Sequence, residues 1–261
     1  MKGGAVRRNK FCLLDPAVSV AVVLITALSA MMFGVRGVRA GDAPVAHIPS
    51  YVEWTPDTIA TASGGDPFRG LLLSRHCAHC HGAEGFSQKP SAANLAGMDR
   101  LVIWKQLQDF RSQKRMSFPM NPIAQSLSSR DVADLAAYYW KLPIFYDPDD
   151  NRAFPQPAPD PVRKGVAWRL VNFGDGERGI PPCQSCHGPV AFRPGAPSLI
   201  TQNSDYVLQQ LEDFATRTRA NDINEAMRTI AGLLSDDERH ALAEYYGAGL
   251  GMNPGSPGTS K

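Results

Sequence analysis

The chain has 261 residues, of which 43% are hydrophobic and 20% charged, and its formal net charge is +2. This composition is typical of a globular protein and excludes wholesale disorder. The first 40 residues hold six of the 27 basic side chains and one of the 25 acidic ones, so the remainder carries 21 basic and 24 acidic residues. That remainder lacks the basic excess of a nucleic-acid-binding protein, and we expect no nucleic-acid partner.

The first 40 residues have the features of a targeting segment. A basic stretch, Arg7 to Lys10, precedes an uncharged and mostly apolar run, Ala17 to Val35, and Val38-Arg39-Ala40 offers a cleavage site. The apolar run approaches the ~20 residues that span a bilayer. A cleaved signal peptide and a retained anchor in the inner membrane through residues 17–35 therefore both stay open. Either alternative exports the rest of the chain, so we predict a periplasmic protein.

The remaining chain divides into five predicted segments, two of which are domains. The linker, from Pro143 to Pro161, is rich in proline, which fixes φ and removes a backbone donor, so it is expected to be extended and semi-rigid. The last residues are rich in Gly, Pro and Ser, as is typical of a loose tail. The predicted segments are an N-terminal extension (41–63), a first domain (64–142), the linker (143–161), a second domain (162–250) and the tail (251–261).

The two predicted domains are copies of one unit. Four motifs recur in the same order, which indicates a duplication. The pairs are Cys77–Gly82 with Cys183–Gly188, Lys105–Phe110 with Gln209–Phe214, Met120–Ala124 with Met227–Ala231, and Tyr138–Tyr139 with Tyr245–Tyr246.

Each copy is predicted to be helical. Ser128 followed by Asp131, and Ser235 followed by Glu238, are capping-box patterns, and apolar residues recur behind them at helical spacing. Helices are also predicted over 99–110 and 205–214. We therefore expect an all-α fold. Since so few helices give a marginal core for a domain of about 80–100 residues, a large buried cofactor would complete the interior.

Cys-x-x-Cys-His is the attachment signature of haem c. Two thiols on one helical turn can form thioethers to the haem vinyl groups, and the following histidine can ligate the iron. A zinc site would need further Cys or His ligands, and the second copy has only His240 to offer. A thioredoxin-like redox pair would need a βαβ context, for which there is no pattern. The sequence thus predicts two haem c groups, with covalent attachment at Cys77, Cys80, Cys183 and Cys186 and proximal iron ligation by His81 and His187.

The second axial ligand decides between a carrier and a catalyst. Met120 and Met227 occupy equivalent positions in the two copies, so we predict that both ligate iron. A lone methionine is usually a packing residue, and we interpret Met116, which has no counterpart in the second copy, as packing near the haem. His76 and His79 adjoin the attachment site and are expected at the haem rim or in solvent. Methionine and histidine together fill both axial positions, which favours electron transfer without catalysis.

These residues resemble the class I c-type cytochromes, and their duplication is similar to the dihaem cytochrome c4 family. The resemblance covers roughly residues 64–250 and rests on the haem motifs, the Gln-Leu-x-Asp-Phe helices and the Met-x-x-Ile-Ala pattern. It implies two tandem cytochrome c domains, each packing an N-terminal helix against the capped C-terminal helix. It also implies that a Pro carbonyl, here Pro197, accepts a hydrogen bond from the proximal histidine. The first copy departs from this pattern with Ala93.

The resemblance also implies an electron carrier between a quinol-oxidising complex and a terminal oxidase. One alternative is the cytochrome subunit of a dehydrogenase that oxidises sulfide, thiosulfate or an alcohol, which the extension with Trp54 could dock. A second alternative, a haem peroxidase, needs an open iron, and two matched methionines argue against it.

Overall fold

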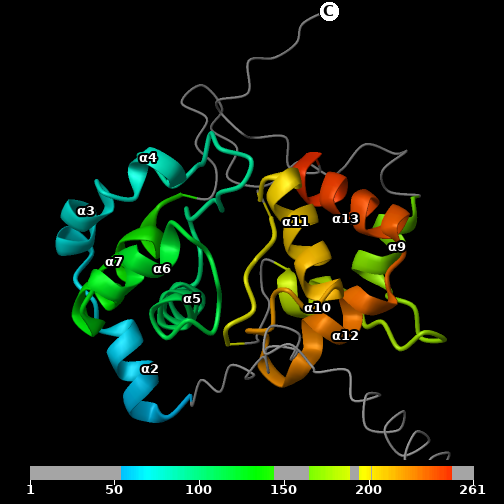
Figure 1. The fold of residues 1–261 in the computed structure, drawn as a ribbon, viewed down its shortest axis with the longest axis horizontal. Coiled ribbons are helices and arrows are strands. Elements are labelled where there is room, and N and C mark those ends of the chain that lie inside the picture. The colour runs from blue at the N-terminus through cyan, green and yellow to red at the C-terminus, as the bar shows by residue number, and fades with distance from the viewer. Residues whose placement is uncertain (1–53, 144–164, 189–193, 201, 249–261) are drawn as a thin grey trace, which may run out of the picture. The chain divides into compact units, whose positions relative to one another are not determined.

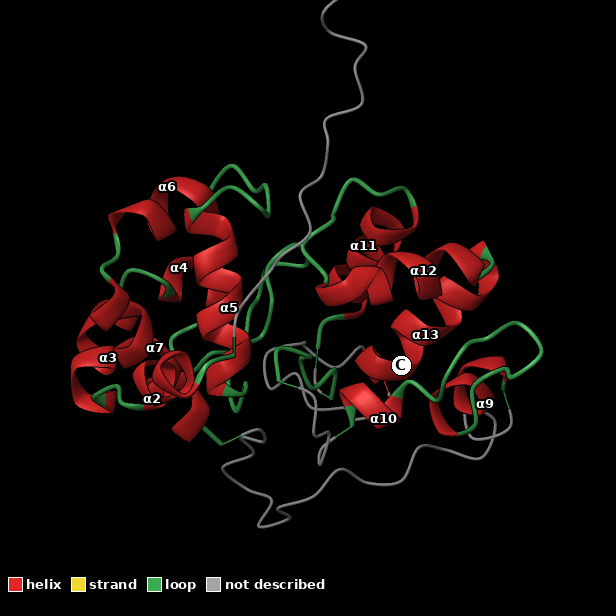
Figure 2. Cartoon of the chain, turned by 90° about the horizontal axis from the view of Figure 1, so that it is seen from below, coloured by secondary structure: helices red, strands yellow, loops and turns green. Residues whose placement is uncertain are grey.

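A computed structural model describes residues 54–143, 165–188, 194–200 and 202–248. Every regular element in these ranges is helical, apart from an isolated bridge between Asp175 and Ile180 (Figure 2). The prediction of an all-α fold is confirmed. Within the same ranges, none of the helices has the length and apolar character needed to cross a bilayer. The predicted signal or anchor, most of the linker and the tail lie outside the described residues.

The first copy and the segment directly before it contain six described helices, coloured blue to green in Figure 1. Its C-terminal helix α7 packs against both α3 and α5. The predicted capping box is present, because Ser128 and Asp131 bond each other's backbone amides at the start of α7. The helices are α2 (Pro56–Ser63), α3 (Pro67–Ser74), α4 (Ala78–His81), α5 (Arg100–Arg111), α6 (Met120–Ser126) and α7 (Ser129–Lys141).

A glycine lets α3 approach α7 closely. A Cβ atom on Gly70 would lie 2.1 Å from the Asp134 carbonyl oxygen, so no larger residue fits at this crossing. The Asp134 carboxylate also accepts hydrogen bonds from the Asp66 amide at 2.7 Å and from Arg69 Nε at 2.8 Å. The predicted contact between the N-terminal and C-terminal helices of this copy is therefore present and fixed by specific residues.

The second copy repeats this arrangement. Its C-terminal helix α13 packs against α9 and α11, and Ser235 and Glu238 make the second predicted capping pair. Its core is a single cluster around Leu170, Leu211 and Leu242. The elements are α9 (Val166–Asn172), α10 (Gln184–His187), α11 (Ser204–Ala215), the 3₁₀ turn η1 (Ile223–Glu225), α12 (Ala226–Leu233) and α13 (Asp236–Ala248).

Helix α2 falls inside the predicted N-terminal extension but packs on the first copy. Ala62 is fully buried in a cluster with Trp104 and Val132, and Trp54 packs against the same cluster. The helix starts with Thr55 as its N-cap and with Pro at its first position, as helix starts commonly do. The predicted domain bounds, 64–142 and 162–250, remain predictions, and α2 adds residues from before Gly64 to the first core.

Candidate haem sites

Each Cys-x-x-Cys-His motif forms one helical turn. Helices α4 and α10 begin directly after Cys77 and Cys183, so both cysteines of a motif and its histidine lie on one turn. All four cysteines are partly buried and make no disulfide bond with one another. Burial raises the pKa of Cys77, and it raises that of Cys183 to about 11. A redox-active CxxC pair needs a cysteine with a lowered thiol pKa, so Cys77 and Cys183 differ from the first cysteine of such a pair.

The two motif histidines are oriented in the same way. His81 Nδ1–H donates to the Ala93 carbonyl and His187 Nδ1–H donates to the Pro197 carbonyl, both at 2.7 Å. Since a carbonyl can only accept, the proton is on Nδ1 and the lone pair is on Nε2, the atom that can ligate a metal. Burial lowers the pKa of both rings and so favours the neutral form that a ligand requires. The hydrogen bond expected from the resemblance is confirmed at Pro197 and is also present at Ala93.

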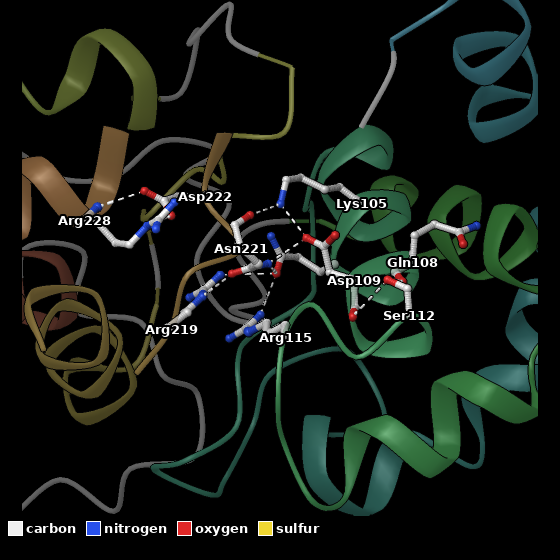
Figure 3. Close-up of polar contacts among 10 residues, drawn as sticks. Lys105, Gln108, Asp109, Ser112, Arg115, Arg219, Asn221, Asp222 and Arg228 are labelled. Carbon is white, nitrogen blue, oxygen red and sulfur yellow. Dashed lines mark hydrogen bonds and ion pairs between the residues drawn. The ribbon is translucent and has the colours of Figure 1, made fainter. Parts of the chain in front are cut away.

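The two predicted methionines begin equivalent helices. Met120 is the first residue of α6 and Met227 the second of α12, and both side chains are partly buried. The residue after each is buried and anchors the helix start. Asn121 Nδ2 donates to the carbonyls of Phe110 and Arg115, both at 2.8 Å. In the second copy the anchor is charged, because Arg228 Nε bonds the Asp222 carboxylate at 2.7 Å (Figure 3).

Met116, which was interpreted as packing, is 71% exposed in the structure. His76 and His79 are exposed as well. The expectation that these two histidines lie at the rim or in solvent agrees with their exposure.

Two matched arginines lie near the motif histidines, and sequence reasoning missed them. Arg115 Cζ lies 4.6 Å from the centroid of the Phe110 ring, over its face. Arg219 Cζ lies 4.4 Å from the centroid of the Phe214 ring in the same way. Both follow a turn with a left-handed residue, Gln113 or Arg217. Each arginine contributes to lowering the pKa of its own copy's histidine. The signal that could have found them is an arginine five residues after the phenylalanine in both copies.

The same arginines meet between the copies. The Gln106 side-chain oxygen accepts from Arg115 at 2.7 Å and from Arg219 at 3.2 Å. The Gln210 oxygen accepts from Arg115 at 2.7 Å and from Arg219 at 2.8 Å. Burial, reinforced by the repulsion from Arg115, lowers the pKa of Arg219 to about 9. The structure thus concentrates positive charge beside both motifs.

A buried charged cluster also joins the two copies. Lys105 Nζ donates to the Asp109 carboxylate and to the Asn221 carbonyl, both at 2.5 Å. Asn221 Nδ2 donates to the same carboxylate at 2.7 Å, and Figure 3 shows the three side chains converging. All three residues are at most 2% exposed. Helix α5 of the first copy is therefore bonded directly to the segment that leads into α12 of the second.

The residues present fit a haem c in each copy. The Tyr139 and Tyr246 hydroxyls, at equivalent positions, are buried without a hydrogen-bond partner of ordinary geometry. Burial, and secondly the nearby Cys77 thiol, raise the pKa of Tyr139, and burial followed by Cys183 does the same for Tyr246. Unpartnered polar atoms beside both motifs indicate that a further group completes each interior. The paired arginines suit a group that carries carboxylates.

Comparison with known proteins identifies the family. No family model matches the chain. Cytochrome c4 of Thiocapsa roseopersicina is 38% identical over 186 residues, which are 69% of this chain and 91% of that protein. The crystal structure of reduced recombinant cytochrome c4 from Pseudomonas stutzeri matches with a TM-score of 0.61 and 30% identity, covering 71% of this chain and 99% of that one. The chain belongs to the cytochrome c4 family.

As a member of this family, the chain consists of two tandem class I cytochrome c domains and carries two haem c groups. It is an electron carrier with His/Met-ligated haems and not an enzyme, and its partners are redox proteins. A further similar protein is the thiosulfate dehydrogenase electron acceptor of Stutzerimonas stutzeri (strain A1501), 38% identical over 191 residues that are 72% of this chain and 83% of that protein. The predicted family, fold class, cofactors and electron-transfer function are confirmed.

Proposed function

We propose that Cys77 and Cys80 attach the first haem and Cys183 and Cys186 the second, with axial pairs His81/Met120 and His187/Met227. The observation that carries this assignment is the matched hydrogen bond, at 2.7 Å in both copies, that leaves Nε2 of each histidine with its lone pair. Two partly buried, neutral histidines oriented alike, each directly after a pair of cysteines, are suited to ligate two irons in the same way.

When bound, each haem supplies a one-electron Fe(III)/Fe(II) couple. The residues of the chain hold the axial ligands in position. The backbone carbonyls hold the histidines, and Asn121 and Arg228 hold the helix starts that carry the methionines. Filled axial positions leave no site for a substrate, so the chain passes electrons between proteins.

An absorption spectrum with the haem quantified per chain tests the assignment. We expect two haems per chain and a sulfur-to-iron charge-transfer band at full strength in the ferric protein. Met120→Ala and Met227→Ala should each remove about half of that band. Met116→Ala is the matched control and should leave it intact. One haem per chain, or a band unaffected by either variant, would reject the assignment.

We propose that the protein works in the periplasm as a shuttle between a quinol-oxidising complex and a terminal oxidase. This rests on the export features of residues 1–40 and on what the resemblance to cytochromes c4 implies. Residues 17–35 either leave with a signal peptide or tether the protein to the inner membrane. Mass spectrometry of the intact protein, purified from its native membranes and periplasm, shows whether residues 17–35 are retained. A cytoplasmic location would overturn both the cleaved and the anchored form of the proposal.

A second candidate function is electron acceptance from thiosulfate dehydrogenase, which the similarity to the Stutzerimonas stutzeri acceptor favours. The test mixes the oxidised dihaem protein with thiosulfate and a purified thiosulfate dehydrogenase and follows haem reduction. Reduction that is fast only when the dehydrogenase is present supports this candidate. A rate equal to that of the enzyme-free control, with rapid reduction by a quinol-oxidising complex, favours the shuttle.

A further inference from the structure

The loops that hold the two proximal histidines differ at the residue whose carbonyl accepts the hydrogen bond. In the second copy this residue is Pro197, whose ring fixes φ and restrains the loop. In the first copy it is Ala93, which has no such restraint. Nevertheless both hydrogen bonds have the same length, 2.7 Å. Some other contact must therefore restrain the loop of the first copy.

That contact comes from the second copy. The Gln202 side chain bonds both backbone groups of Asn94, the residue that follows Ala93. Its Nε2 donates to the Asn94 carbonyl at 2.7 Å, and its Oε1 accepts from the Asn94 amide at 3.1 Å. Gln202 and Asn94 are each 4% exposed, so water does not compete for these bonds.

Asn94 is also bonded to the attachment turn. Its side-chain oxygen accepts from the Ser87 amide at 2.7 Å, and the Ser87 hydroxyl donates to the Cys80 carbonyl at 2.6 Å. The residue held by Gln202 thus contacts the first haem motif by two routes. One route runs through Ala93 to His81, and the other through Ser87 to Cys80.

The same contact cannot form in reverse at the equivalent position. The position in the first copy equivalent to Gln202 is Met98, which is buried in its own copy's core and has no amide. At this position the first copy therefore has no side chain that could hydrogen-bond the Pro197 loop as Gln202 bonds the Ala93 loop. Pro197 restrains the loop of the second copy, and Gln202 of the second copy restrains the loop of the first.

We propose that Gln202 is a positioning residue for the first haem, holding the proximal loop of the other domain in place of the missing proline. It acts through Asn94 and Ala93 on the hydrogen bond to His81. This inference rests on the proposed ligation by His81. A proximal histidine that donates a firm hydrogen bond is a stronger electron donor to iron and stabilises the ferric state. Loosening the loop should therefore raise the potential of the first haem and leave that of the second unchanged.

The experiment compares Gln202→Met, which installs the residue found at the equivalent position 98, with the unaltered dihaem protein. Potentiometric titration measures the reduction potentials of both haems. The same titration in a Met227→His background identifies the potential of the second haem, because replacing its methionine ligand lowers that potential. At a fixed ambient potential, the ferric-to-ferrous ratio of the first haem should fall roughly threefold to tenfold, the effect of about one net hydrogen bond. Gln209→Met, on the exposed side of α11, is the matched control and should shift neither haem.

The decisive variant is the rescue. Adding Ala93→Pro to Gln202→Met supplies the restraint from within the first copy and should return the first haem's potential toward its original value. Hydrogen exchange at the Asn94 amide should be faster in Gln202→Met and report the loss of the clamp directly. Two haems with unchanged potentials in Gln202→Met, or an equal shift of both, would overturn the positioning role of Gln202 and leave the proposed ligation intact. Absence of a haem at Cys77 and Cys80 in the unaltered protein would instead overturn the proposed ligation.

Discussion

The residues around the two motif histidines are arranged in the same way in both copies. In both, the histidine donates to a loop carbonyl, a left-handed residue ends the helix that follows, and an arginine then covers a phenylalanine ring. Two buried tyrosine hydroxyls without partners, Tyr139 and Tyr246, complete the parallel. Residues that the proposed haem sites require are thus repeated in both copies.

The copies differ at two positions where they contact each other, although the matched arginines Arg115 and Arg219 also meet there. Lys105, which bonds across to Asn221, corresponds to Gln209, which is exposed. Gln202, which bonds across to Asn94, corresponds to Met98. A duplicated domain must keep the residues that hold its cofactor, but only one copy of each contact is needed between the halves. We therefore expect the members of these two pairs of equivalent positions to respond differently to mutation.

The largest expected difference is between Lys105→Met and Gln209→Met. Lys105→Met removes a buried ion-pair partner of the Asp109 carboxylate, which should lower the free energy of unfolding by about 3–5 kcal/mol. The same substitution at the exposed, equivalent Gln209 should change it by no more than about 0.5 kcal/mol. Denaturant unfolding of the haem-loaded proteins measures both. Equal losses would show that the buried cluster has no special role.

Gly195 provides the next contrast. It has φ 86°, and a Cβ atom there would lie 3.1 Å from Lys105 Cδ and 3.3 Å from Trp54 Cζ2. Gly195→Ala should therefore destabilise the protein by about 1–3 kcal/mol. Gly232 lies in α12 with open space around its Cα, so Gly232→Ala should be neutral or stabilise by up to about 1 kcal/mol. Thermal unfolding scans reveal the sign, and destabilisation by both would contradict the prediction.

The capping serines test the symmetry of the copies. Ser128→Ala and Ser235→Ala each remove the hydroxyl that accepts from a backbone amide, at 3.1 and 3.2 Å respectively. Both should lower the free energy of unfolding by about 1 kcal/mol. Urea titrations of the two variants should give midpoints lowered by similar amounts. A loss in one variant only would mean that one C-terminal helix start depends on other contacts.

The smallest expected effect is on the acid limb of stability. The hydrogen bond from Ser128 lowers the pKa of Asp131, and the pair with Arg178 lowers that of Glu238. A carboxyl group with a lowered pKa in the folded state stabilises it above the group's ordinary pKa and loses that effect as pH falls. Glu238→Gln should therefore flatten the decline in urea midpoint between about pH 5 and pH 3. An unchanged slope would assign the decline to other groups.

Much of this protein could be predicted from its sequence, because the chemistry of haem attachment is local. Two cysteines and a histidine on one turn, a methionine downstream and a capping Ser-x-x-acid are short-range patterns, and repeating them in one order indicates two copies of one domain. The all-α class, the haem number and the electron-transfer function all follow from these patterns. The carbonyl expected at Pro197 was predictable from the resemblance for the same reason.

Only the tertiary structure decided which residues join the halves. Lys105 and Asn221, or Gln202 and Asn94, are more than 100 positions apart in the sequence, so nothing local indicates that they meet. A lysine within a helix is ordinarily a solvated side chain, and only burial against the other copy turns it into a bonded cluster. The same holds for helix α2, which lies in the predicted extension but packs on the first core, where Ala62 is fully buried. Contacts of this kind depend on how two folded surfaces match, and no pattern in a single stretch of chain encodes that match.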